Sequence, residues 1–311
     1  MSRSQNPVLV QSGTLWETIQ AVSKDLQGAG IEHFRLEAER LIAYALEMSR
    51  VDLFMDRERR LGSDDEERIR SLIDRRMQGE PLQYITGLAE FMSLPFAVDP
   101  RVLIPRPETE TLVEAVVGRF SRKDPVVLCD IGVGSGAVAV SLARNLPESV
   151  VLGVDVSQSA LDLAGENAVR NDVVGRVVFR RADVRIEPFD GWELAPFDAV
   201  VSNPPYVSQE EWGKLPVEIR EHEPRVALCD EGDGLTFFRL IARKSGGVLK
   251  PGGWLFLETG DSQGRKVMAI LEESGYEGLE ILPDLGGIGR VVKGQKGISL
   301  TERRNHSRET S

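Results

Sequence analysis

The sequence contains few of the residues that metal centres and hydrolytic triads require. Its 311 residues include only two cysteines, Cys129 and Cys229, and three histidines, His33, His222 and His306. No Cys-x-x-Cys or Cys/His spacing occurs, so we expect no metal site. None of the histidines shares a motif with a serine or cysteine nucleophile, which disfavours triad hydrolysis. Because Cys129 lies in an apolar run, it is expected to be a buried structural thiol.

Long apolar runs and an excess of positive charge are also missing. No stretch reaches about eighteen apolar residues, and no basic region followed by an apolar core opens the chain, so a cytoplasmic protein that does not bind membranes is expected. The net charge of −11 disfavours direct binding to nucleic acid. Hydrophobic residues make up 41% and charged residues 28%, which is typical of a globular protein with room for two domains.

The first third of the sequence has the periodicity of helices. Leu15, Ile19, Val22 and Leu26 recur at helical spacing, which predicts a small helical domain over residues 14–80. Ser63, followed by three acidic residues, is expected to cap the start of a further helix.

A linker with a β-hairpin is predicted over residues 81–107. Large apolar residues alternate between prolines from 88 to 104, which favours a hairpin, and Pro105-Arg106-Pro107 ends it. Residues 108–120 return to helical spacing.

Strands and helices alternate from residue 126 onward, which predicts a doubly wound, seven-stranded Rossmann-like sheet in a catalytic domain over 108–294. The expected strands are 126–130, 150–155, 177–181, 197–202, 253–259, 279–282 and 290–293, and the expected helices are 137–145, 158–171, 235–249 and 263–274. Residues 1–13 are expected to be frayed and the polar tail 295–311 to be disordered.

A glycine-rich loop follows the first of these strands. It reads Asp130, Ile131, Gly132, Val133, Gly134, Ser135 and Gly136. Its GxGxG spacing differs from the GxGxxG of dinucleotide-binding loops. Backbone amides at a helix N-terminus suit the carboxylate of an amino-acid moiety, and Asp130 is expected to lie near its ammonium group.

Two further acids follow the next two strands. Asp155 is placed to accept ribose hydroxyls, although this residue alone would suit NAD equally well. Asp183 is expected to accept the exocyclic amine of adenine, with backbone amides near Val184 reading the ring edge. The three acids together favour a nucleoside cofactor with an amino-acid end, S-adenosyl-L-methionine, over NAD.

The fourth strand ends in Asn203-Pro204-Pro205-Tyr206. Two prolines remove two N–H donors, so this segment, here called the lip, presents mainly hydrogen-bond acceptors. The Asn203 side-chain oxygen and the Pro204 carbonyl are predicted to accept the two hydrogens of a substrate NH₂ group. Tyr206 is expected to stack against that planar group. The Asn203 amide nitrogen is also expected to face the cofactor. The lip alone does not distinguish glutamine from adenine.

The sequence resembles the release factor glutamine-N5 methyltransferases (the PrmC, or HemK, family) over roughly residues 14–292. The resemblance is carried by the blocks 83–87, 90–96, 103–110, 130–136 and 203–206 and by Glu223-Pro224-Arg225 with Asp233-Gly234. The block Ile104–Glu110 is its most specific part. Val133 departs from the hydroxyl or small polar residue usual in the family.

The resemblance implies an activity, a partner and residue roles. It implies methyl transfer from S-adenosyl-L-methionine, with S-adenosyl-L-homocysteine as product, to the glutamine amide of the Gly-Gly-Gln motif in class 1 peptide chain release factors. It assigns Gly132–Gly136, Asp155 and Asp183 to the cofactor and Asn203–Tyr206 to the glutamine. The helical domain would help to dock the release factor, and we expect a monomer.

Three other functions fit the sequence less well. A nucleic acid adenine-N6 methyltransferase would need a basic face laced with aromatic residues, which the acidic charge disfavours. A nucleotide-binding dehydrogenase predicts GxGxxG and has no use for the lip. A non-catalytic interaction protein has no reason to keep both the loop and the lip.

Overall fold

The computed structural model describes residues 13–297, which fall into two compact units. One contains the chain up to Gly87 together with Val217–His222, and the other contains Leu88–Pro216 and the chain from Glu223 onward. The segments expected to be frayed or disordered, 1–12 and 298–311, lie outside the described residues. In the part that is described, no helix is long and apolar enough to cross a membrane.

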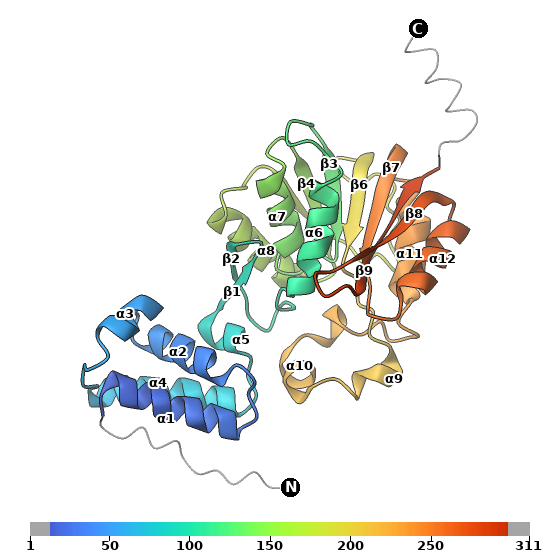
Figure 1. Ribbon diagram of the computed structural model, residues 1–311. Coiled ribbons are helices and arrows are strands. Elements are labelled where there is room, and N and C mark those ends of the chain that lie inside the picture. Colours follow the sequence, from blue (N-terminus) through green and yellow to red (C-terminus); the bar gives the residue numbers. More distant parts are fainter. Residues whose placement is uncertain (1–12, 298–311) are drawn as a thin grey trace. The chain divides into compact units, whose positions relative to one another are not determined.

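The helical unit contains α1 (Leu15–Gly28), α2 (Phe34–Ala45), α3 (Arg50–Met55), α4 (Ser63–Met77), α5 (Leu82–Thr86) and α10 (Val217–His222) (Figure 1). Its first helix begins at a capping box, in which Thr14 and Glu17 each accept a hydrogen bond from the other's backbone N–H. Leu15, Ile19 and Val22 are fully buried, as their spacing predicts. The helical character of this region is therefore confirmed.

One local expectation in this unit was wrong, and short helices were missed. Gly62 is the N-cap of α4, and Ser63 is the first helical residue and makes no capping bond. The acids after Ser63 still occupy the first turn, where the helix dipole favours them. The short helices α5 and α10 were not expected, because five or six residues are too few to show a helical period.

Buried Arg76 joins three helices of this unit. Its guanidinium binds Glu37 of α2 at 2.6 Å and Glu218 of α10 at 3.1 Å, and the side chain is only 6% exposed. A buried cation requires such partners, because its desolvation is costly. Through this contact α10, which lies far along the sequence, packs with the first helices.

The second unit is a mixed α/β structure. Its elements are β1 (Leu88–Phe91), β2 (Leu94–Ala97), η1 (Pro107–Thr109), α6 (Glu110–Val117), β3 (Val127–Ile131), α7 (Ala137–Asn145), β4 (Val150–Asp155), α8 (Gln158–Arg170), β5 (Val177–Arg181), β6 (Phe197–Ser202), α9 (Gln209–Trp212), η2 (Arg225–Ala227), α11 (Thr236–Ser245), β7 (Leu249–Glu258), α12 (Gly264–Glu273), β8 (Tyr276–Pro283) and β9 (Gly289–Lys296). The last strand reaches two residues into the predicted tail.

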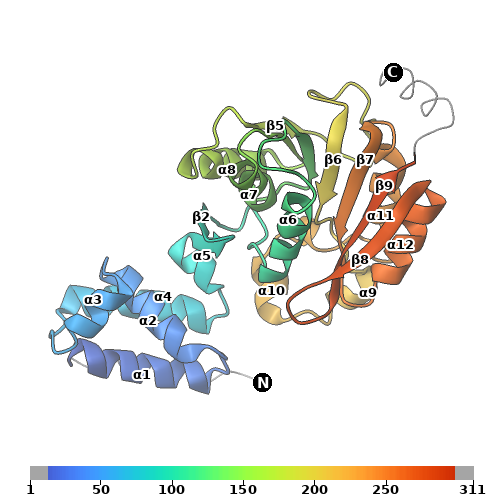
Figure 2. The ribbon, with the colours of Figure 1, turned by 45° about the horizontal axis from the view of Figure 1, so that its top comes forward.

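Seven of the strands form one sheet in the order β5-β4-β3-β6-β7-β9-β8. The five strands β3, β4, β5, β6 and β7 run parallel to one another. Strand β9 pairs antiparallel with both β7 and β8. Helices α6, α7 and α8 lie on one face and α11 and α12 on the other (Figures 1 and 2). The predicted doubly wound, seven-stranded class is thus confirmed.

Alternate strand residues supply the two cores that hold these helices. Leu128, Val151 and Val201 pack into the cluster that contains α6 to α8. Cys129 and Val200 point the other way, into the cluster that contains α11 and α12. Successive side chains of a strand point to opposite faces, so strands of a sheet buried on both faces contribute to both cores.

The strand order reverses at β3. The chain moves from β3 outward to β4 and β5, then returns to place β6 on the other side of β3. Ligands of open α/β sheets bind at such a point, beyond the carboxyl ends of the strands.

The hairpin β1–β2 is shorter than predicted. It ends at Ala97, and the chain then turns at Asp99, whose carbonyl accepts from the Val102 N–H. Two asparagines, Asn167 on α8 and Asn171 at its C-cap, hold the hairpin. Asn167 exchanges hydrogen bonds with both backbone groups of Ala97, and Asn171 donates to the Pro95 carbonyl.

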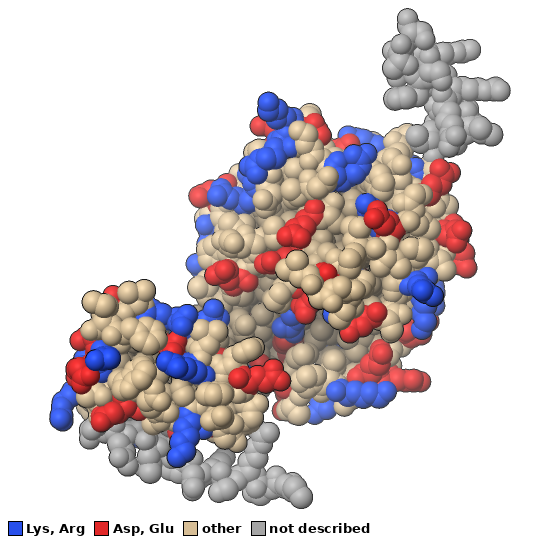
Figure 3. Space-filling model, in the orientation of Figure 1, with Lys and Arg blue, Asp and Glu red and all other residues tan. Residues whose placement is uncertain are grey.

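Figure 3 shows Lys and Arg interspersed with Asp and Glu on the face that it presents. Mixed signs of this kind give no single-sign field on that face for steering a polyanion.

We predict that Gly153→Ala destabilises the fold. A Cβ at Gly153 would lie 2.8 Å from Val133 Cγ2 and 3.0 Å from the Phe179 ring. Overpacking of this kind costs about 1 to 3 kcal/mol of unfolding free energy, measured by urea denaturation. Adding Val133→Ala to Gly153→Ala should restore part of the lost unfolding free energy. Gly165→Ala, on open space in α8, is the matched control and should not destabilise; equal losses in both variants would contradict the packing account.

Candidate active site

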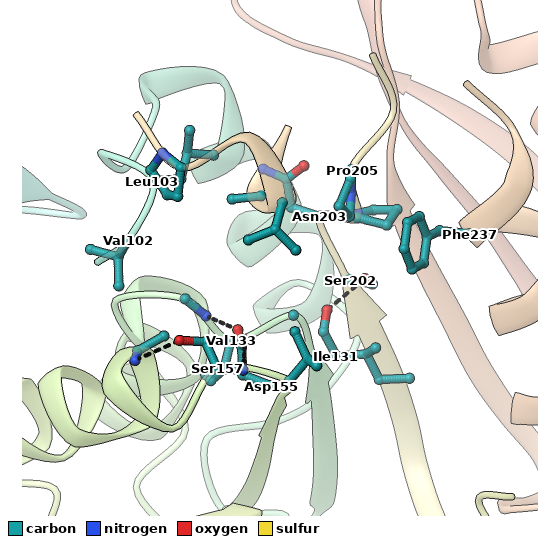
Figure 4. Close-up of a pocket in the computed structure, with 18 of the residues that line it drawn as sticks. Val102, Leu103, Ile131, Val133, Asp155, Ser157, Ser202, Asn203, Pro205 and Phe237 are labelled. Carbon is teal, nitrogen blue, oxygen red and sulfur yellow. Dashed lines mark hydrogen bonds between the residues drawn. The ribbon is translucent and has the colours of Figure 1, made fainter. Parts of the chain in front are cut away.

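A cavity of about 630 Å³ lies at the carboxyl ends of the parallel strands (Figure 4). This volume is typical of small-molecule sites. All its lining residues belong to the α/β unit. They come from η1 and the segment before it, the loop after β3, the ends of β4 and β5, the first turns of α7 and α8, the lip after β6, the segment around η2, and α11. Among them are Val102, Leu103, Thr109, Gly132, Asp155, Asp183, Asn203, Pro205, Arg225 and Phe237.

The glycine loop is shaped by backbone angles that disfavour other residues. Gly132, Gly134 and Gly136 all have positive φ. A Cβ at Gly136 would also lie 3.2 Å from the Ala164 Cβ, so this glycine lets the start of α7 approach α8 closely. The Gly132 N–H donates to the Val154 carbonyl at 2.8 Å, which ties the loop to the neighbouring strand.

Val133 is oriented toward the core. Its side chain is 5% exposed and packs with the cluster under α6 to α8, over Gly153. The departure from the usual small polar residue is therefore matched by a glycine on β4, which leaves space for the valine methyl groups.

Asp155 lies at the end of β4 and lines the cavity. Its carboxylate accepts from the Gly134 N–H and from the Ser157 N–H, each at 2.9 Å. Burial raises the pKa of Asp155, and these backbone donors partly offset the rise. The carboxylate thus holds the glycine loop while remaining at the cavity wall.

Asp130 lies beneath the loop and is not among the residues that line the cavity. It is 2% exposed and accepts from the Ala139 N–H at the start of α7. Burial raises its pKa to about 7, and the charge of Asp155 adds to the rise. Its expected role beside an ammonium group stays a prediction. Gly136 likewise lies outside the cavity wall.

Asp183 lines the cavity with Val184, as placed from the sequence. Its carboxylate makes a bidentate pair with Arg185, at 2.9 and 2.7 Å. Hydrogen bonds from that guanidinium lower the pKa of Asp183. A ligand amine that donates to the Asp183 carboxylate would therefore bind it alongside the Arg185 guanidinium.

The lip begins where β6 ends beside β3. Ser202 Oγ donates to the Ile131 carbonyl at 2.6 Å, which joins the two strand ends. Asn203, Pro204 and Pro205 line the cavity. The Asn203 Nδ2 donates to Thr109 Oγ1 at 3.1 Å, so its predicted contact with a cofactor stays a prediction.

Tyr206, the last residue of the lip, is partly buried. Its ring packs against the core cluster of α11 and α12 and is not part of the cavity wall. Gln263 Nε2 donates to the Tyr206 carbonyl and to the Gly234 carbonyl, which fixes the lip from behind. Burial raises the pKa of the Tyr206 hydroxyl to about 12, so it stays protonated at neutral pH. Stacking against a substrate stays a prediction.

The block Ile104–Glu110 pins three segments around the cavity. Arg106 pairs with Glu223, which also accepts from the Ile104 N–H. Glu110 Oε1 accepts from the Met92 N–H at the hairpin turn. Thr109 reaches Asn203 directly, and sequence reasoning missed this contact although it noted both motifs. Among residues 13–297, no group of His, Cys, Asp and Glu is arranged to hold a metal.

Comparison with known proteins matches both parts of the chain to families. Residues 17–87 match the PrmC N-terminal domain, and residues 108–220 match the methyltransferase small domain. A release factor glutamine methyltransferase of Geobacter sulfurreducens is 41% identical over 86% of this chain and 92% of its own length. One from Moorella thermoacetica is 41% identical over 89% of this chain and 96% of its own length.

The chain belongs to the release factor glutamine methyltransferase family. It is therefore a methyltransferase, and the resemblance noted in its motifs is confirmed. A solved protein-(glutamine-N5) methyltransferase (release factor-specific) from Alicyclobacillus acidocaldarius is 32% identical, with 65% of this chain and 99% of that chain covered at a TM-score of 0.38. The family assignment rests on the sequence relatives.

We predict that Arg106 and Glu223 of this methyltransferase are strongly coupled. Glu223 is 1% exposed, so removing Arg106 would leave a buried charge unpaired. A double-mutant cycle with Arg106→Gln and Glu223→Gln should give a coupling energy of about 1 to 3 kcal/mol in urea denaturation.

The pair Asp99–Arg101, with both side chains 36% exposed, is the matched control. Its cycle should give less than about 1 kcal/mol, because solvent screens exposed pairs. If the two cycles gave equal values, burial would not be what makes the Arg106–Glu223 pair matter.

Proposed function

We propose that this enzyme transfers a methyl group from S-adenosyl-L-methionine to the side-chain amide nitrogen of the glutamine in the Gly-Gly-Gln motif of class 1 peptide chain release factors. The observation that carries the proposal is the acceptor lip, Asn203-Pro204, at the wall of a cavity bounded by the glycine loop. The release factor as substrate is supported by the printed names of the relatives.

The cavity fits a nucleoside with an amino-acid end. Its volume is suitable, and three glycines of positive φ let a ligand approach the backbone of the loop. In this proposal Gly132–Gly136 hold the amino-acid end, Asp155 accepts the ribose hydroxyls, and Asp183 with Val184 borders adenine. When bound, S-adenosyl-L-methionine supplies an electrophilic methyl group on a positively charged sulfur.

The lip makes a poor nucleophile reactive. An amide nitrogen reacts weakly because its lone pair is delocalised into the carbonyl. The Asn203 Oδ1 and the Pro204 carbonyl each accept one N–H of the glutamine amide, which orients the nitrogen and raises its electron density. As the nitrogen gains the methyl group it becomes acidic and releases one proton to water, so the lip needs no strong base.

We also propose how the rest of the chain contributes. The helical domain, 14–80, would help to dock the release factor, and the linker 81–107 would join it to the catalytic domain 108–294. We propose that the enzyme acts as a monomer. A protein that modifies release factors would act in the cytoplasm, where these factors work.

Transfer of labelled methyl groups tests the substrate. With labelled S-adenosyl-L-methionine, purified release factor should take up label, and a factor whose Gly-Gly-Gln glutamine is replaced by alanine should not. Label in both factors would contradict the glutamine assignment. Label in DNA or RNA, and none in the factor, would favour the adenine methyltransferase instead.

Asn203→Ala should separate turnover from cofactor binding. Loss of one acceptor for the substrate amide should lower kcat by about 10²- to 10³-fold. Affinity for S-adenosyl-L-homocysteine, measured by calorimetry, should stay within a few fold of wild type. If Asn203→Ala had the wild-type kcat, the Asn203 side chain would have no role in catalysis.

Asp155→Ala should act on the cofactor instead. Loss of a carboxylate at the ribose should weaken S-adenosyl-L-homocysteine binding by about 10-fold or more, since a hydrogen bond to a charged group is worth about 1.5 to 3 kcal/mol. Asp162→Ala, on the outer face of α8, is the control and should bind normally. Unchanged affinity in Asp155→Ala would place the ribose elsewhere.

A further inference from the structure

Glu258 is a buried carboxylate beside the lip that the proposed chemistry does not use. It ends β7, and its neighbour Leu257 pairs with Ser202 of β6, so Glu258 lies next to Asn203 in register. The residue is 2% exposed. Its Oε2 has no hydrogen-bond partner in the described chain, and Glu258 does not line the cavity.

Thr109 lies beside both Glu258 and Asn203. It is 5% exposed, and its hydroxyl accepts from the Asn203 Nδ2 at 3.1 Å. Burial raises the pKa of Glu258, and Thr109 and Asn203, as donors close to its carboxylate, oppose that rise. The three side chains thus lie close together, with Glu258 and Thr109 buried and Asn203 at the cavity wall.

The direction of these hydrogen bonds decides what the lip presents. A side-chain amide has an acceptor at one end and a donor at the other, and the two ends are nearly equal in size. The lip accepts from a substrate amide only if the Asn203 Oδ1 faces the cavity. The hydroxyl of Thr109 does not settle this alone, because it can either donate or accept.

An ionised Glu258 removes that ambiguity. A carboxylate only accepts, so the single hydrogen of the Thr109 hydroxyl goes to Glu258. The hydroxyl oxygen is then available only as an acceptor, which places the Asn203 Nδ2 toward Thr109 and Oδ1 toward the cavity. A protonated Glu258 can donate to Thr109 and would permit the opposite orientation.

We propose that Glu258 is a positioning residue that sets the orientation of the Asn203 amide through the hydroxyl of Thr109. This inference rests on the proposed function in so far as the lip binds a substrate NH₂ group. Its structural part, the coupling of Glu258 to Asn203, holds whatever the substrate is.

The charges around Glu258 give the expected pH dependence. Burial raises its pKa to about 7; Arg290 of β9 opposes the rise and Glu108 of η1 adds to it. Arg290 is itself paired with Asp284 and Asp261. The charge of Glu258 raises the pKa of the nearby Tyr206 hydroxyl, and the charges of Arg290 and Arg106 lower it. Glu258 is protonated below its pKa, so the lip is correctly oriented above about pH 7 and loses its orientation as the pH falls.

Steady-state kinetics over pH 5.5 to 9 test the effect on catalysis. Wild type should show an acidic limb in kcat near pH 7. The amide of Glu258→Gln does not titrate and can either donate to Thr109 or accept from it, so it no longer fixes the orientation of Asn203. The acidic limb should therefore disappear, and kcat should fall about 10-fold at every pH while KM changes little. Thr109→Ser should retain much more activity than Thr109→Val, because serine keeps the hydroxyl.

Two controls accompany the kinetics. Glu108→Gln removes an exposed carboxylate near the cluster and should keep the acidic limb. Thermal melting and S-adenosyl-L-homocysteine binding should show that Glu258→Gln is folded and holds the cofactor product normally. A folded Glu258→Gln enzyme with wild-type kcat and an unchanged limb would overturn the proposal.

Nuclear magnetic resonance tests the orientation without any substrate or activity. In protein labelled with ¹⁵N-asparagine, the Asn203 side-chain NH₂ signals, assigned with Asn203→Asp, should shift with a midpoint near pH 7. The shift should be absent in Glu258→Gln. Asn167, which binds Ala97 and Ser135 instead, is the internal reference. Asn203 signals that do not change with pH would refute the coupling even if the release factor proved to be the substrate, and a clear titration would support it even if the substrate proved to be different.

Discussion

The hydrogen bond from Ser202 Oγ to the Ile131 carbonyl joins the two strand ends from which the whole site is built. The glycine loop leaves the end of β3, and the acceptor lip leaves the end of β6. Because the two strands are parallel neighbours at the point where strand order reverses, both segments emerge on the same side of the sheet. The glycine loop and the lip therefore border one cavity.

Contacts from outside the sheet hold these two segments in place. Asn167 ties the Ser135 carbonyl of the loop to the hairpin, and Gln263 holds the carbonyl of Tyr206. Thr109, the last residue of η1, binds the Asn203 amide. Catalysis by positioning needs such a supporting layer, because an unfavourable nucleophile reacts only when it is held in line.

Some of this structure was predictable from sequence and some was not. Strands β4, β5 and β6 and helix α7 match their predicted bounds, because buried strands read as short apolar runs between turns. The loop and lip residues also reach one cavity, except Asp130, Gly136 and Tyr206. The Glu258–Thr109–Asn203 cluster, the Asp183–Arg185 pair and the place of α10 were not predictable, since each depends on contacts that no local pattern records.

The account's central claim is that the lip accepts the two hydrogens of a glutamine amide. A crystal structure with S-adenosyl-L-homocysteine and a peptide containing Gly-Gly-Gln tests it most directly. The account predicts the glutamine amide nitrogen within about 3 Å of both the Asn203 Oδ1 and the Pro204 carbonyl, with its free side toward the sulfur. A glutamine bound away from the lip, or its carbonyl oxygen in place of the nitrogen, would contradict the account.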